Sequence, residues 1–163
     1  MNQTIAINKT LLVVKFLILL LIIFCAPFIG NQFITGTIVN ASLIISFFTL
    51  GFGSSILLCF LPSVISFALG MMALPLMIPF IILGNIILIL SFKFFNKYWL
   101  SLFSGSILKF LFLFLITNTL IKFIVSDPVF NKIAIMMSYP QLVTAILGGI
   151  LAYIVLKKVK LDF

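Results

Sequence analysis

Residues 11–25 read LLVVKFLILLLIIFC, an apolar run whose only charge is Lys15. A helix needs about 20 mostly apolar residues to cross the hydrocarbon core of a bilayer, and this run extends to residue 29 without another charge. The rest of the chain is similar: 64% of its 163 residues are hydrophobic and 7% are charged, with a mean hydropathy of +1.46. A domain of this size leaves much of its surface outside. The sequence therefore predicts that lipid covers this surface.

Further apolar runs follow, separated by clusters of glycine, proline and polar residues. Together the runs predict six transmembrane helices, at residues 11–29, 33–50, 54–70, 75–92, 99–124 and 133–156. The predicted fold class is an all-α integral membrane protein, a bundle of six transmembrane helices in a single domain over residues 1–163. The first run also has features of a signal peptide, with Lys9 and Lys15 ahead of it. Because no small-residue cleavage site follows, we expect an uncleaved helix.

The placement of lysine predicts how the helices face, because cytoplasmic loops carry an excess of basic residues. With the N-terminus inside, seven lysines lie on the inner side: Lys9, Lys15, Lys93, Lys97, Lys157, Lys158 and Lys160. The outer side has Lys122 and Lys132, near Asp127. We therefore expect both termini to be cytoplasmic and the loops near 30–33, 71–74 and 125–132 to face outward. The abundance of Lys, Ile, Phe and Asn without Arg favours a bacterial plasma membrane.

The ionisable residues exclude most catalytic chemistry. The chain has no Arg, His or Glu, and its acids are Asp127 and Asp162. Metal sites and paired-carboxylate catalysis need clusters that these residues do not supply, and a serine or cysteine nucleophile has no His base. No P-loop is present, so the chain is not its own ATPase. We expect a protein that is not an enzyme, with no metal, no cofactor and no nucleic-acid partner, and we attribute the net charge of +8 to membrane topology.

Polar side chains at membrane depth are the candidate functional residues, because lipid rejects them. The predicted substrate-binding residues are Asn40, Asn85, Lys109, Gln141 and Thr144. Lys109 is the strongest signal, since it lies about ten residues into the fifth span, too deep for its ammonium to reach the interface easily. A purely structural lysine at this depth needs a cage of backbone carbonyls or a side chain that snorkels to the interface; the alternative is a polar cavity or a bound anion. For Asn40 and Asn118, hydrogen bonds that simply hold the bundle are an equal alternative.

The sixth span carries two predicted faces. Met137, Gln141, Thr144 and Gly148 are spaced to share one side of a single helix. Pro140 within this span frees a backbone carbonyl, which marks either a cavity or a kink, as it does for Pro62 and Pro79. The predicted packing face is formed by small residues that allow another helix to approach closely, namely Ala145, Gly149 and Ala152. This face is buried either in its own bundle or against a partner subunit.

Several segments resemble the membrane-embedded substrate-binding subunits of energy-coupling-factor vitamin transporters. They are FITGTIVNA at 33–41, LMIPFIILGN at 76–85, SILKF at 106–110 and MMSYPQL at 136–142, followed by Gly148 and Gly149. The resemblance implies a six-helix subunit with an outward site that docks on a transmembrane scaffold carrying two ATPases and topples to release its substrate inside. The family's docking motif is a pair of alanines four apart in the first helix. Here only Ala26 and Gly30 have that spacing, at the outer end.

These observations predict a substrate-binding subunit for the uptake of a small vitamin-like solute. The alternative is a small non-transport membrane protein, either a structural or assembly partner or an oligomeric pore. The polar residues at membrane depth include one cation and no acid. Because an unpaired buried charge is costly, we expect a neutral or anionic ligand that meets Lys109, with Asn85 and Gln141 bonding its polar edge.

Overall fold

The computed structural model describes residues 2–70 and 75–159, with side chains from residue 9 onward. Every element in these ranges is helical: α1 (Asn2–Cys25), η1 (Ala26–Ile29), α2 (Gln32–Leu50), α3 (Phe52–Ala68), η2 (Pro75–Met77), α4 (Ile78–Phe94), α5 (Tyr98–Ile116), η3 (Thr117–Ile121), α6 (Lys122–Ile124), α7 (Asp127–Met136) and α8 (Tyr139–Lys158). The predicted loop at 71–74, Lys160 and Asp162 lie outside the described residues. The all-α class is confirmed for the part of the chain that the structure describes.

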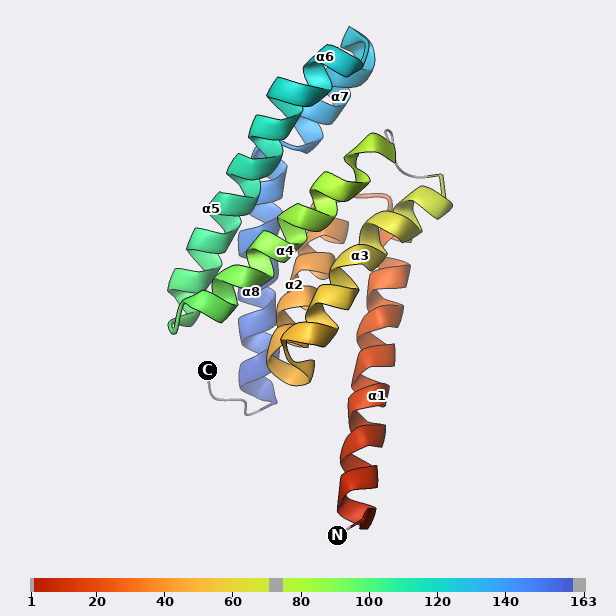
Figure 1. The fold of residues 1–163 in the computed structure, drawn as a ribbon, viewed down its shortest axis with the longest axis vertical. Helices are drawn as coiled ribbons and strands as arrows, with labels where there is room; N and C mark the ends of the chain where they lie inside the picture. The colour runs from red at the N-terminus through yellow and green to blue at the C-terminus, as the bar shows by residue number, and fades with distance from the viewer. Residues whose placement is uncertain (1, 71–74, 160–163) are drawn as a thin grey trace.

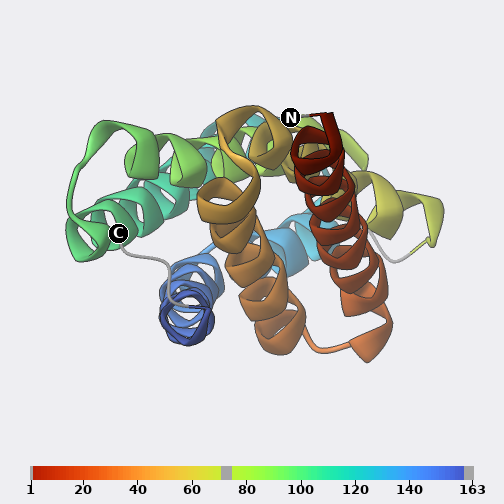
Figure 2. The same cartoon turned by 90° about the horizontal axis from the view of Figure 1, so that it is seen from below.

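The helices run back and forth between two ends of the molecule (Figure 1). The α2–α3 turn at Gly51, the α4–α5 turn at 95–97 and the end of α8 lie toward one end, which we call the lysine end. The start of α2, the start of α4 and the hairpin of α6 and α7 lie toward the other, which we call the Asp127 end. Viewed from below, the helices enclose an interior, with α1, α2 and α8 along one side (Figure 2).

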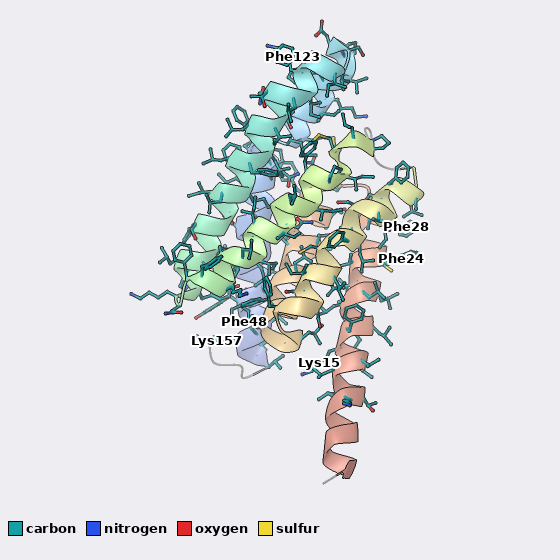
Figure 3. All side chains as sticks on the ribbon, viewed as in Figure 1. Lys15, Phe24, Phe28, Phe48, Phe123 and Lys157 are labelled. Atoms are coloured by element: carbon teal, nitrogen blue, oxygen red, sulfur yellow. The ribbon has the colours of Figure 1, made fainter. Side chains whose placement is uncertain are left out.

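The outer surface of the bundle is apolar. Large hydrophobic side chains project from the helices, including Phe123, which is 86% exposed, and Phe24 and Phe28 on the outer side of the first pass (Figure 3). Five segments are long and apolar enough to cross a membrane: Lys9–Ile29, Gln32–Leu50, Pro75–Phe94, Tyr98–Ile124 and Asp127–Lys158. The remaining helix, α3, is apolar but has 17 residues. By length and composition this is a multi-pass membrane protein.

The first five predicted spans match observed helical segments to within a few residues, but the sixth is wrong in part. The predicted helix at 133–156 is divided between α7 and α8, with Met137 and Ser138 between them. The physical reason is Pro140, which lies in the first turn of α8, where its missing N–H costs nothing. Pro140 therefore starts a helix and does not kink one. Met137 consequently does not share a helix face with Gln141.

The other prolines divide in the same way. Pro79 lies in the first turn of α4, whereas Pro62 lies inside α3. At the start of α2, the Asn31 side chain accepts a hydrogen bond from the Phe33 amide at 2.9 Å and caps the helix. The preceding Gly30 has a φ of 70°, a left-handed conformation that glycine adopts without strain. This turn returns the chain from η1 into the bundle.

Close approach of α8 to its neighbours organises the interior. A Cβ placed on Gly36 of α2 would lie 3.0 Å from the Thr144 side chain, so these helices pack almost backbone to backbone. On the other side of α8, Gly149 leaves no room for a Cβ beside Leu102 of α5. Ala145 and Ala152 are fully buried. The small-residue face of the sixth span is therefore buried in its own bundle.

Candidate functional site

Lys109 is buried at the centre of the bundle and holds two amide side chains. It is 2% exposed. Its Nζ donates hydrogen bonds to Asn40 Oδ1 at 2.6 Å and to Asn85 Oδ1 at 2.8 Å. The three residues come from α5, α2 and α4, so three helices converge on one ammonium group. The polar partners of Lys109 are side-chain amides and not the cage of backbone carbonyls that a purely structural lysine was expected to need.

Each asparagine is itself oriented by a second contact. Asn40 Nδ2 lies 3.5 Å from Thr144 Oγ1, and Asn85 Nδ2 donates to the Cys59 carbonyl at 3.4 Å. With the Nδ2 groups turned toward these acceptors, both Oδ1 atoms face Lys109. The arrangement thus links α3 and α8 to the same centre. Because unpaired polar groups are expensive in this environment, these bonds hold the position of the ammonium.

The local sequence makes this convergence sterically feasible. Gly84 lies one residue before Asn85, and a Cβ placed there would lie 3.5 Å from Lys109 Cγ. Gly148 stands opposite Asn40, where a Cβ would lie 2.7 Å from the Asn40 Cβ. Gly148 therefore leaves space for the Asn40 side chain, whereas a Cβ at Gly84 would approach Leu113 Cδ1 most closely, at 3.3 Å, and only touch the lysine stem. The close packing that small residues permit between membrane helices is used here to build a polar centre.

A cavity of about 360 Å³ extends from this centre toward the Asp127 end. Its lining residues come from η1, η2, α2, α3, α4, α5, α7, α8 and the turns that precede α2 and α8. The polar ones are Asn31, Gln32, Thr35, Asn40, Ser63, Ser66, Asn85, Lys109 and Gln141. The apolar ones are Pro27, Val39, Pro62, Met77, Ile81, Ile133, Met136 and Met137. A ligand that is partly polar and partly apolar matches this lining.

Two glutamine side chains link neighbouring helices at the Asp127 end of the cavity. Gln32 Nε2 and Gln141 Nε2 both donate to the Met136 carbonyl, at 2.8 and 3.2 Å. Since Met136 is the last residue of α7, its exposed carbonyl would otherwise lack a helix partner. The two glutamines connect α7 to α2 and α8. Gly30 and Asn31, which are exposed, line the cavity at this end.

The charge of the cavity is that of a single lysine. Lys109 is the one ionisable side chain among the lining residues, and no carboxylate lies among them. The described residues also contain no group of three or more His, Cys, Asp and Glu side chains suited to a metal ion. The cavity lining thus combines one positive charge with neutral hydrogen-bond donors and acceptors.

Four of the five predicted substrate-binding residues line this cavity: Asn40, Asn85, Lys109 and Gln141. The fifth, Thr144, lies behind Asn40 and contacts it without lining the cavity. Asn118, for which a bond that holds the bundle was one alternative, donates to the Phe114 carbonyl of its own helix at 2.8 Å.

Four further polar residues line the cavity but were not among the predicted substrate-binding residues, namely Gln32, Thr35, Ser63 and Ser66. For α2 a signal was available, because Gln32, Gly36 and Asn40 recur at four-residue spacing and so lie on one helix face.

The predicted packing residues lie away from the cavity. Gly149, Ala145 and Ala152 are buried between α8 and its neighbours. The Gly149 carbonyl accepts a hydrogen bond from the Tyr98 hydroxyl at 2.6 Å, which fixes the start of α5 against α8. These residues therefore hold α8 against its neighbours on a side away from the cavity.

Comparison of the chain with protein families, curated proteins and solved structures gives no match.

Proposed function

We propose that the protein is a membrane-embedded substrate-binding subunit for the uptake of a small vitamin-like solute. The observation that carries the proposal is the 360 Å³ cavity, which is formed within one chain and has Lys109 in its wall. Such pockets, mostly apolar with a few convergent polar groups, are typical of small-molecule sites. An oligomeric pore would instead repeat one polar stripe around a shared axis.

The direction of uptake follows from the lysines. At the lysine end, Lys93 Nζ lies 4.2 Å from the centre of the Phe52 ring and Lys157 Nζ lies 5.5 Å from that of Tyr153. Figure 3 places Lys15 and Lys157 in the same lower part of the molecule. The positive-inside rule assigns this end to the cytoplasm. The cavity then extends toward the outer face, where a solute arrives.

The source of energy lies in other subunits under this proposal. The chain has no P-loop, so ATP-driven uptake requires separate ATPases and a transmembrane scaffold. The resemblance to the substrate-binding subunits of energy-coupling-factor transporters supports this division of labour. Lipid covers the apolar outer surface, and a scaffold would replace part of that lipid during transport.

The test is purification of the chain in mild detergent, followed by measurement of its mass and of the small molecules released on denaturation. We expect a monomer that carries a solute enriched over an unrelated membrane protein prepared in the same way. A ring-shaped oligomer without such a solute would contradict the proposal and support the pore. Mass spectrometry of the released fraction is the deciding measurement.

A further inference from the structure

Ser63 lines the cavity and carries a buried hydroxyl group without a hydrogen-bond partner. Its side chain is 2% exposed and lines the cavity from α3, yet its Oγ has no hydrogen-bond partner. A buried hydroxyl without a partner is costly, typically by about 1–3 kcal/mol. A hydrogen bond from the Ser63 hydroxyl to a bound molecule would remove this cost.

Ser63 differs from three other buried serines of the described chain. Ser46, Ser55 and Ser91 each donate to the carbonyl three residues earlier in their own helix, at 2.6–2.7 Å. Ser63 makes no such bond, and the Cys59 carbonyl, one turn before it, already accepts from Asn85 Nδ2. Because Asn85 also accepts from Lys109, the same amide connects the Ser63 turn of α3 with the ammonium.

Lys109 also has one N–H donor beyond the two that bond to the asparagines. An ammonium group has three N–H donors, and two of them go to Asn40 and Asn85. Both acceptors are neutral amides, and no carboxylate lines the cavity. The positive charge is therefore solvated but not neutralised within the cavity. Lys109 of α5 and Ser63 of α3, one with a charged donor and one with a neutral donor, both line the cavity.

We propose that the ligand is a small monoanionic carboxylate, held by the third N–H of Lys109 and by the Ser63 hydroxyl. This inference rests on the proposed function and names the substrate class of that site. A carboxylate has two oxygens that accept from two separate donors, and bonds to a charged group are the stronger ones. A single ammonium neutralises one negative charge, so a phosphate dianion would bring an uncompensated charge into the bundle.

The apolar lining of the cavity defines the rest of the ligand. Met77, Met136 and Met137 lie among the lining residues with Ile81, and methionine adapts its shape to the molecule beside it. The carbon skeleton of the ligand packs against these side chains, while its carboxylate bonds to Lys109 and Ser63. A largely apolar monocarboxylate fits this lining.

The experiment uses the full chain in lipid nanodiscs and pairs of probes that differ in charge but not in shape. Benzoate is compared with benzamide, phenylacetate with phenylacetamide, and indole-3-acetate with indole-3-acetamide. Binding is measured by thermal stabilisation and by calorimetry. In parallel, the small molecules released from the purified chain are identified by mass spectrometry in both ionisation modes. We expect carboxylates to bind at least about tenfold more tightly than their amides.

Two alanine variants make the test specific. Ser63→Ala removes no hydrogen bond from the protein, so the variant should fold, and it should weaken carboxylate binding about tenfold. Ser106→Ala is the matched control, since the Ser106 hydroxyl is also fully buried and without a partner but does not line the cavity. Carboxylate binding to the control should be unchanged.

The outcomes separate this inference from the proposed function. Amides that bind as well as carboxylates, or equal effects of the two alanine variants, overturn the carboxylate site. A released solute that is neutral or cationic also overturns it, while the substrate-binding function stands. If no solute is released and no probe stabilises the chain, the proposed function fails and this inference fails with it.

Discussion

Gly148 lies so close to Asn40 that a Cβ at position 148 would be 2.7 Å from the Asn40 Cβ. The same Cβ would lie 2.9 Å from the Thr37 carbonyl oxygen and 3.0 Å from the Ala41 amide nitrogen. Backbone atoms of α2 cannot move aside as a flexible side chain does. The absence of a side chain at Gly148 therefore allows α2 and α8 to meet at the level where Asn40 contacts Lys109.

Gly148→Ala should destabilise the protein and disturb the polar centre. Overpacking a tight interface typically costs about 1–3 kcal/mol, and the helices must separate where Asn40 is held. We expect a lower midpoint of thermal unfolding in detergent. Gly53→Ala is the control, because a Cβ at Gly53 of α3 meets nothing within 4 Å. An alanine at 148 that is as well tolerated as one at 53 would show that the α2–α8 contact is looser than described.

Lys109 and Asn85 should be coupled in a double-mutant cycle. Asn85→Leu removes one of the two acceptors of a buried ammonium, and an inadequately solvated charge destabilises the fold strongly. In a Lys109→Met background the same change removes an amide that no longer faces a charge, so its cost should be smaller by about 1–3 kcal/mol. Chemical or thermal unfolding of the four proteins measures this difference. Additive effects would contradict the coupling.

Lys109→Met also tests the ligand directly. The methionine keeps an apolar side chain of similar length but removes the charge. We expect the affinity for the co-purified solute to fall by about 1.5–3 kcal/mol, the usual worth of a hydrogen bond to a charged group. Calorimetric titration of the folded variant is the measurement, with Lys122→Met as the control because Lys122 is exposed and lies outside the cavity. Unchanged affinity would remove Lys109 from the site.

The sequence predicted which residues are polar at membrane depth, because single polar side chains stand out in apolar runs. It grouped Asn40, Asn85 and Lys109 in one substrate site but did not predict that both amide oxygens accept hydrogen bonds from Lys109 itself. Their convergence depends on where α2, α4 and α5 cross, and the helix period within one segment does not specify that crossing. The contact is therefore a property of the three packed helices and not of any one segment.

Ser63 and Met137 show two other limits of the sequence. Serine in a membrane helix usually bonds to its own backbone, so nothing in the local sequence distinguishes Ser63 from Ser46 or Ser55. Its role depends on a missing partner, which is a property of the packed bundle. For Met137, continuous apolar spacing favoured one long helix, and the preference of Pro140 for a first helical turn prevailed over that spacing.

Tyr98→Phe should weaken the contact between α5 and α8 without affecting the cavity. The hydroxyl donates to the Gly149 carbonyl at 2.6 Å in a buried setting, and loss of such a bond costs about 0.5–1.5 kcal/mol. Tyr139→Phe is the matched control, since Tyr139 is 61% exposed. We expect a lower unfolding midpoint for the first variant alone, with ligand affinity retained in both. Equal midpoints would show that the bond adds no net stability.

The orientation of the bundle is testable with introduced cysteines. Asn96 lies in the α4–α5 turn at the lysine end, and Asn131 lies in α7 at the Asp127 end; both are exposed. Figure 1 shows these two elements at opposite ends of the molecule. After replacement of Cys25 and Cys59, a membrane-impermeant thiol reagent added to intact cells should label a cysteine at 131 and not one at 96. Permeabilised cells, in which both positions should react, provide the control. Labelling at 96 alone would invert the bundle, so that the cavity would extend toward the cytoplasm and an uptake subunit that captures its solute from outside would no longer fit.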